Sequence, residues 1–119
     1  MQYALLLYST PDAMANLSPT ELKQVSAEFW ALRDEPGILD GGGLQPVTTA
    51  TTIRLADGKP LVTDGPFADT KEIFGGYYIY EADNLDQAIE MAGRIPTLRL
   101  GGAIEVRPLL DKASHPDHA

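Results

Sequence analysis

The sequence predicts an α+β fold in which two β-α-β units flank a β-hairpin. Three observations support it: short apolar runs typical of strands, two stretches with helical spacing, and one Asp-Gly pair between further strand-like runs. They follow one another in the order β-α-β, hairpin, β-α-β. This order predicts a split βαβ arrangement of ferredoxin-like type, with the hairpin inserted between its halves.

The first β-α-β unit begins with a continuous apolar run at residues 3–8. Ser18 is then placed to cap a helix, with Pro19 at its first position and Glu21 as the capping-box partner, and the helix is expected to run to about Asp34. Its apolar residues recur every three or four positions and predict one buried stripe, made of Leu22, Val25, Phe29 and Leu32.

The middle of the chain predicts a second strand and a hairpin. The second strand begins at Ile38, and the glycines at 41–43 indicate a bulge or a close backbone approach. Asp57-Gly58 lies between two β-branched runs and predicts a tight turn, although Lys59 and Pro60 leave a longer loop open.

The second β-α-β unit starts with an aromatic strand at 77–81. Asp83 or Asn84 caps the next helix, and residues 103–107 form a half-buried final strand. The apolar stripe expected on this helix is Leu85, Ala88, Ile89 and Ala92. We expect a single domain at 1–110 and a flexible tail at 111–119.

Composition narrows the classes of partner. Seventeen acidic and nine basic residues give a net charge of −8, which disfavours binding to nucleic acid and to anionic membranes. The sequence has no cysteine, which excludes disulfides, thiolate nucleophiles and cysteine-ligated metals. Its apolar start has no basic flank and is too short for a signal peptide or a membrane span. We therefore expect a cytoplasmic protein.

Residues 64–72, Asp-Gly-Pro-Phe-Ala-Asp-Thr-Lys-Glu, gather three carboxylates and a lysine around a Gly-Pro pair. This segment resembles the DGPF signature of the YCII-related proteins, as do Gly-Leu-Gln-Pro at 43–46 and Gly-Gly-Tyr-Tyr at 75–78. The resemblance implies membership of the dimeric α/β-barrel group, in which two sheets close face to face. Independently, helices on one face of the sheet would leave its other face uncovered, so we predict a homodimer.

The start of the signature supports two interpretations. Asp64 could accept hydrogen bonds from nearby amides in a turn, or it could be a partly buried carboxylate suited to general acid or base catalysis. Gly65 is expected in an extended region that a side chain would crowd. Phe67 is expected to anchor the segment in the core, with a place in a pocket wall as the alternative.

The end of the signature is also ambiguous. Asp69 and Glu72 have the spacing of a helix cap and its capping-box partner, or they could contact a substrate or a metal. Lys71 is either their counter-charge or a binder of an anionic or carbonyl group. Arg54 could join it at a pocket, as could Arg33, although both also fit a solvated surface.

The remaining candidates are aromatic residues and histidines. Tyr77 and Tyr78 point to opposite faces of their strand, and one hydroxyl, for which we name Tyr78, could reach a cleft or a dimer seam. Trp30 could pack at the helix edge, line the cleft or enter a dimer contact. The only histidines, His115 and His118, lie in the expected tail, so no imidazole is available in the body for a His-Asp pair or for haem.

These observations predict two classes of function. In the first, the protein binds or transforms a small molecule, without a cofactor, in a cleft beside the DGPF segment, with Asp64 as acid or base and Asp69, Lys71, Glu72, Arg54 and Tyr78 as ligand contacts. In the second, it is a non-catalytic partner or regulatory module, since the resemblance implies an association with sigma-factor systems of transcription.

Overall fold

The computed structural model describes residues 1–68 and 71–110 and contains one four-stranded antiparallel sheet with the order β2-β5-β1-β6. Its strands are β1 (Gln2–Ser9), β2 (Ile38–Gly43), β5 (Ile73–Glu81) and β6 (Ala103–Pro108). The first and second strands of each β-α-β unit are separated by a strand of the other unit, which is the split βαβ arrangement. The predicted ferredoxin-like α+β fold is confirmed.

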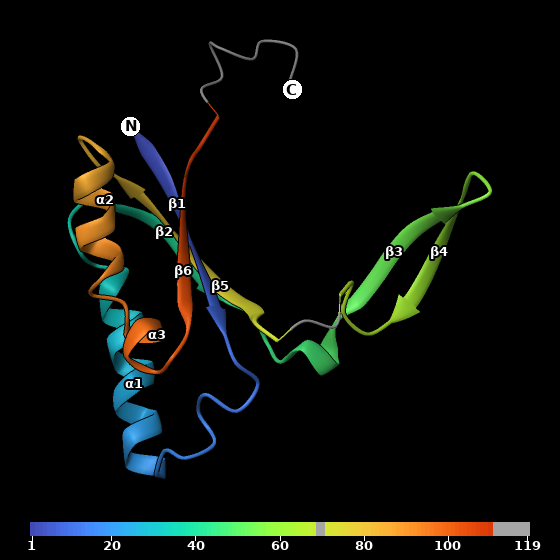
Figure 1. Cartoon of the computed structure of the whole chain (residues 1–119), viewed down its shortest axis with the longest axis horizontal. Helices are drawn as coiled ribbons and strands as arrows, with labels where there is room; N and C mark the ends of the chain where they lie inside the picture. The colour runs from blue at the N-terminus through green and yellow to red at the C-terminus, as the bar shows by residue number, and fades with distance from the viewer. Residues whose placement is uncertain (69–70, 111–119) are drawn as a thin grey trace.

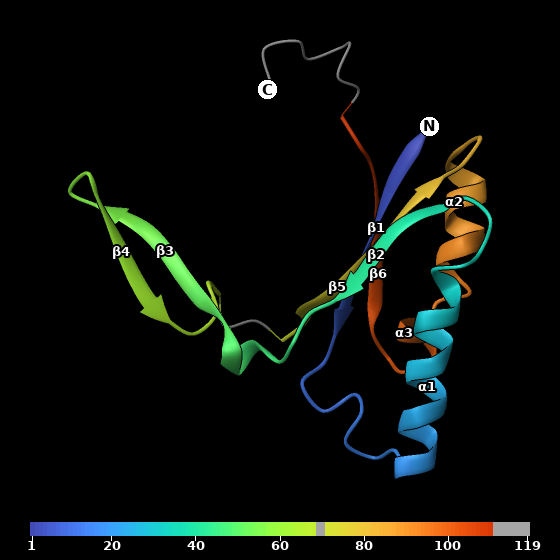
Figure 2. The same ribbon diagram turned by 180° about the vertical axis from the view of Figure 1, so that it is seen from behind.

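The α-helices all lie on one side of this sheet (Figures 1 and 2). They are α1 (Pro19–Leu32), α2 (Leu85–Ala92) and the one-turn α3 (Pro96–Arg99). The sequence did not predict α3, because a single turn carries no periodic pattern. Among the described residues, no helix is both long and apolar enough to cross a membrane.

Both long helices begin where the sequence predicts. The Ser18 hydroxyl accepts the Glu21 N–H at 3.2 Å, and the Glu21 carboxylate accepts the Ser18 N–H at 3.1 Å, which completes the capping box. At α2, the Asn84 side chain accepts the Gln87 N–H at 2.9 Å, so Asn84 rather than Asp83 is the cap.

The core lies between the sheet and the helices. Alternate residues of β1 and β5 face the helices and are buried, and Leu5 is completely inaccessible to solvent. The buried side chains of these strands are Tyr3, Leu5, Leu7, Tyr78 and Tyr80. Because paired residues of antiparallel strands share a face, Leu5 and its partner Tyr78 form the centre of this layer.

The helical stripes differ in part from the prediction. Leu22, Leu85 and Ile89 are exposed. On α2 the buried line continues into the following loop and consists of Ala88, Met91, Ala92 and Ile95. These residues keep the helical spacing of three and four, but Ile89 lies beside the buried line and is exposed.

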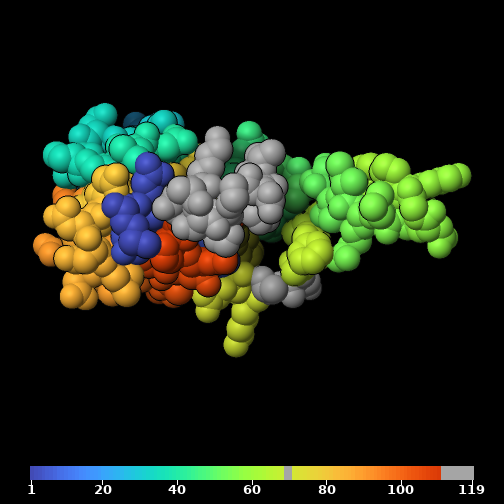
Figure 3. All heavy atoms as spheres, turned by 90° about the horizontal axis from the view of Figure 1, so that it is seen from above, coloured from blue at the N-terminus to red at the C-terminus, as the bar shows by residue number. Residues whose placement is uncertain are grey.

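The hairpin forms a separate two-stranded sheet, made of β3 (Thr51–Ala56) and β4 (Lys59–Asp64). It extends away from the helix-and-sheet body (Figure 3), and we call it the arm. Asp57 and Gly58 have φ angles of 51° and 79°, as a tight two-residue hairpin turn requires. Lys59 pairs with Ala56, so the longer loop left open by the sequence does not form.

The second face of the four-stranded sheet carries no helix (Figure 2). Ala4, Leu6, Tyr77 and Ile79 occupy its centre, where they pair across β1 and β5 and are half-buried. The sequence anticipates this uncovered face. The homodimer that it led us to expect stays a prediction. The predicted tail, 111–119, lies outside the described residues.

Candidate functional site

The DGPF segment begins where the arm rejoins the body. Gly65 follows β4 with a φ of 106°, a backbone angle that favours glycine. Its N–H donates to the Ala50 carbonyl at 2.8 Å, and the Thr52 hydroxyl donates to the Gly65 carbonyl at 2.7 Å. A Cβ added at Gly65 would meet no atom of the described residues within 4 Å, so the backbone angle, rather than the predicted crowding of a side chain, accounts for this glycine.

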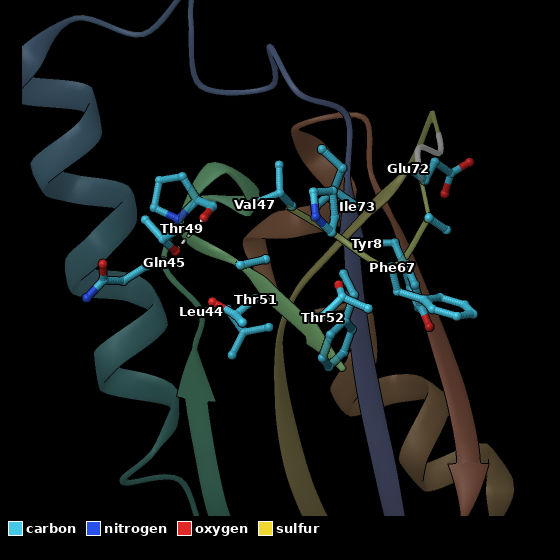
Figure 4. Close-up of a pocket in the computed structure, with 15 residues that line it drawn as sticks. Tyr8, Leu44, Gln45, Val47, Thr49, Thr51, Thr52, Phe67, Glu72 and Ile73 are labelled. Atoms are coloured by element: carbon cyan, nitrogen blue, oxygen red, sulfur yellow. Dashed lines mark hydrogen bonds between the residues drawn. The ribbon is translucent and has the colours of Figure 1, made fainter. Parts of the chain in front are cut away.

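A cavity of about 660 Å³ lies between the base of the arm and the adjoining end of the four-stranded sheet (Figure 4). Its walls are mostly apolar, with threonine hydroxyls, the Tyr8 phenol and one carboxylate among them. We call it the arm-base cavity. It is lined by Tyr8, Leu44, Gln45, Pro46, Val47, Thr49, Ala50, Thr51, Thr52, Pro66, Phe67, Ala68, Glu72, Ile73 and Phe74.

Two sequence motifs that lie about twenty residues apart meet at this cavity. Leu44, Gln45 and Pro46 come from the Gly-Leu-Gln-Pro motif, and Pro66 and Phe67 come from the DGPF segment. In Figure 4, the segment that contains Gln45 and Thr49 forms one side, and Phe67, Tyr8 and Glu72 lie toward the other. The arm connects these motifs, and its turn brings them together.

Phe67 lies in the wall of this cavity and is 70% exposed, so the prediction that it anchors the segment in the core is wrong. The Arg54 guanidinium lies 4.5 Å from the centre of its ring, in a cation–π contact. The ring therefore contacts the arm, and the alternative interpretation, a place in a pocket wall, matches the geometry. Arg54 does not line the cavity itself, but it contacts the wall residue Phe67.

Asp64 is the last residue of β4 and is exposed. It is not among the lining residues of the arm-base cavity. Within residues 1–68 and 71–110, no backbone amide donates a hydrogen bond to its carboxylate, so neither the expected turn nor the expected burial is seen. Its role as an acid or base stays a prediction.

The acidic end of the signature does not begin a helix. Lys71 and Glu72 precede β5, which starts at Ile73, so the capping-box interpretation of Asp69 and Glu72 is wrong. A strand, rather than a helix, follows because the run after Glu72 is apolar and aromatic and pairs with β1. Glu72 lines the cavity, whereas Lys71 is exposed and outside its lining. Asp69 itself lies outside the described residues.

Tyr78 faces the helices and belongs to a different cavity from the DGPF segment. Its hydroxyl donates to the Phe29 carbonyl at 2.6 Å, and Tyr77 occupies the opposite face of the sheet. Burial raises the pKa of Tyr78, while the nearby charge of Arg33 acts in the opposite direction. The phenol is therefore neutral and holds α1 against the sheet.

The sequence did not single out several residues of the site. Tyr8 was assigned to the first strand and Phe74 was given no role, yet both line the arm-base cavity, and their ring centres lie 5.6 Å apart. Thr52 combines its place in the lining with the hydrogen bond to Gly65. The motif at 43–46 was the one available signal, because the formation of a strand does not by itself require a Leu-Gln-Pro sequence after it.

Metal ligands do not gather in the part of the chain that the structure describes. There, no three histidine, aspartate or glutamate side chains are close enough together to hold an ion. His115 and His118, like Asp69, lie outside it.

Comparison with known proteins agrees with the fold and the motifs. The family model of the YCII-related domain matches residues 1–112. The chain belongs to the YCII-related family. A relative in this comparison is an uncharacterized protein, R00369, of Rhizobium meliloti (strain 1021), which is 34% identical over 116 residues that cover 92% of each chain.

A solved structure with a similar fold is 5-chloro-2-hydroxyhydroquinone dehydrochlorinase (TftG) from Burkholderia phenoliruptrix AC1100, in complex with 2,5-dihydroxybenzoquinone. The TM-score is 0.51 at 17% identity, and the match covers 96% of this chain and 98% of that one. At this identity the likeness concerns the fold.

Proposed function

We propose that this protein binds a small organic molecule in the arm-base cavity. One observation carries the proposal: two family motifs, at 43–46 and 64–67, contribute walls to the same cavity although the whole arm separates them in sequence. Its volume of about 660 Å³ falls within the usual range of roughly 300–1,000 Å³ for small-molecule sites.

The lining favours a mostly apolar ligand that carries hydroxyl groups. The hydroxyls of Thr49 and Thr52 already donate to the carbonyls of Pro46 and Gly65, both at 2.7 Å, so toward a ligand these oxygens can act only as acceptors. Aromatic rings at Tyr8, Phe67 and Phe74 suit an aromatic or quinonoid ring. The dihydroxybenzoquinone bound by the similarly folded dehydrochlorinase is a molecule of this kind.

Transformation of the ligand would require an acid or base within hydrogen-bond reach. Glu72 is the one described carboxylate in the lining, and Asp64 stands outside it. We keep Asp64 as the candidate acid or base at the rim. The candidate ligand contacts are Glu72, Asp69, Lys71 and Arg54. Variants of Asp64 and Glu72 separate these two roles.

A non-catalytic role as a partner or regulatory module, of the kind associated with sigma-factor systems, is the second candidate. The arm favours it, because Ile53, Leu55 and Val62 on one of its faces are all more than half exposed. Apolar surface of this kind favours protein contact. We also propose a homodimer, supported by this apolar face and by the uncovered side of the main sheet.

Thermal unfolding across a panel of phenols, quinones and hydroxylated aromatic acids tests the binding proposal. A ligand at 100 times its dissociation constant stabilises the folded state by about 2.7 kcal/mol. We expect the melting temperature of the wild type to rise with a phenol or quinone, and the rise to be lost in Phe67→Ala, which removes an exposed wall ring at little cost to stability.

Two further variants sharpen the same experiment. Asp64→Asn and Glu72→Gln keep the side-chain shape and remove the charge, so a binding defect in one of them identifies the carboxylate that contacts the ligand. Lys23→Gln, on the exposed side of α1, is the control. A flat panel in the wild type contradicts the binding proposal and favours the partner role.

A further inference from the structure

A second cavity, of about 460 Å³, lies on the helix side of the sheet, between α1 and the ends of β2 and β5. We call it the α1 cavity. Part of its floor is backbone, because Gly42, Gly43, Gly75 and Gly76 occupy the neighbouring strand ends. A Cβ added at Gly43 would meet nothing within 4 Å. A flat floor without side chains suits a planar ring.

Trp30 and Arg33 stand at the mouth of the α1 cavity, one turn apart at the end of α1. The Arg33 guanidinium lies 5.2 Å from the centre of the Trp30 ring, and Trp30 is 66% exposed. The stacked indole and guanidinium form a cation–π pair that is open to solvent. Both groups are therefore available to a ligand.

The charge in this cavity is positive and unneutralised. Arg33 makes no salt bridge with any residue in the described ranges, and no aspartate or glutamate is among the lining residues. The cavity therefore offers no counter-charge to a cation. The Arg33 guanidinium can bind a carboxylate through two parallel hydrogen bonds.

Further hydrogen-bond donors and apolar side chains line the α1 cavity. The hydroxyls of Ser9 and Ser26 line the cavity and make no hydrogen bond with a described residue, so both can donate to an oxygen anion. Leu7 and Phe29 supply apolar walls. The net charge of −8 opposes an anion at long range, but at physiological salt charges beyond about 8 Å are largely screened, so Arg33 dominates locally.

We propose that the α1 cavity is a binding site for a planar aromatic carboxylate, whose ring lies on the glycine floor beside Trp30 and whose carboxylate pairs with Arg33. This site is separate from the arm-base cavity, although Leu44 lines both. The proposal does not rest on ligand binding beside the DGPF segment.

The protein contains one tryptophan, so its single indole N–H resonance reports directly on this site. We would titrate the full chain with 2-naphthoate and, separately, with the neutral 2-naphthylmethanol. We expect a saturable shift of the Trp30 indole resonance with 2-naphthoate and at least tenfold weaker binding of the alcohol, since the alcohol lacks the charge that pairs with Arg33. Equal binding of the two probes, or no saturable shift with 2-naphthoate, would overturn the proposal.

Two variants give an independent test. Arg33→Gln should weaken 2-naphthoate binding at least tenfold, whereas Arg107→Gln, which removes one positive charge on β6, should leave it unchanged. Phe67→Ala should also leave it unchanged. If Phe67→Ala abolishes binding and Arg33→Gln does not, the anion occupies the arm-base cavity, which contradicts this inference and supports the proposed function.

Discussion

The helix-and-sheet body and the arm are built from similar residues but use them differently. In the body, β1 places Tyr3, Leu5 and Leu7 under the helices, where they are at most 6% exposed. In the arm, Ile53 and Leu55 alternate in the same way along β3 and are 67% and 75% exposed. Both strands place apolar side chains at alternate positions along one face, and only in the body does a helical layer cover that face.

This difference explains why the candidate site lies at the junction. An isolated two-stranded hairpin is at best marginally stable, so the arm depends on its attachment and on whatever covers its apolar face. The arm-base cavity has one wall on the body and another on the arm. We therefore expect body variants to change global stability, and arm variants to change local order and binding.

The largest expected contrast comes from truncating matched leucines. Leu5→Ala creates a cavity in the core and should lower the free energy of unfolding by about 2–5 kcal/mol. Leu55→Ala removes exposed surface and should change it by less than about 0.5 kcal/mol in dilute protein. Denaturant unfolding of both variants measures the contrast. A cost at Leu55 equal to that at Leu5 would mean that the arm is covered in solution.

Two glycines of the body sharpen the contrast at the backbone level. A Cβ at Gly102 would lie 2.4 Å from the Tyr8 carbonyl oxygen, whereas one at Gly43, where the chain leaves β2 toward the arm, would meet nothing within 4 Å. Gly102→Ala should therefore cost about 1–3 kcal/mol through overpacking, and Gly43→Ala should be close to neutral. Thermal melts compare them, and equal melting temperatures would refute the close packing at Gly102.

In the arm, Gly58→Ala should act locally. Gly58 has a φ of 79°, and an L-residue in that region costs roughly 1–2 kcal/mol. We expect faster hydrogen exchange of the β3 and β4 amides with unchanged exchange in β1 and β5. An equal acceleration in the body strands would show that arm and body unfold together, and the comparison drawn above would fail.

The smallest expected effect depends on pH and concerns α1. The backbone and side-chain hydrogen bonds with Ser18 lower the pKa of Glu21 from its ordinary value of 4.5. In that range the unfolded chain binds more protons, so the carboxylate stabilises the fold above about 4.5 and the gain is lost as pH falls through the lowered pKa.

Glu21→Gln should therefore lower stability at neutral pH, and its difference from the wild type should shrink in acid. Denaturant melts over a pH series measure this difference. Glu105→Gln, on the exposed side of β6, is the matched control for the loss of one carboxylate charge. A difference between Glu21→Gln and the wild type that grows in acid would reverse the assigned sign.

Local signals in the sequence account for most of the fold. The capping box at Ser18 and the Asp57-Gly58 turn depend on residues within a few positions of each other, and both form as predicted. Side-chain surroundings depend on distant segments. The sequence could place Tyr77 and Tyr78 on opposite faces but could not decide which is buried, because β1 is apolar on both faces.

The sequence predicted where the candidate site lies, but only part of the arrangement of its side chains. The DGPF segment does border a cavity, as its composition and family resemblance indicate, but the exposure of Phe67 and Asp64 follows from the projection of the arm. No local pattern encodes that projection, since the same alternation of residues would suit a hairpin packed on the body. For Trp30 the sequence left a helix edge, a cleft and a dimer contact open, and for Arg33 a pocket or a solvated surface.

The central claim, that the arm-base cavity binds a small molecule, is tested most directly by NMR mapping of backbone amides during titration with a phenol and quinone panel. We predict saturable shifts concentrated at residues 44–52, 66–68 and 71–74, with the helices unchanged. Shifts confined to residues 26–33 of α1, or no saturable shift with any compound, would contradict the claim.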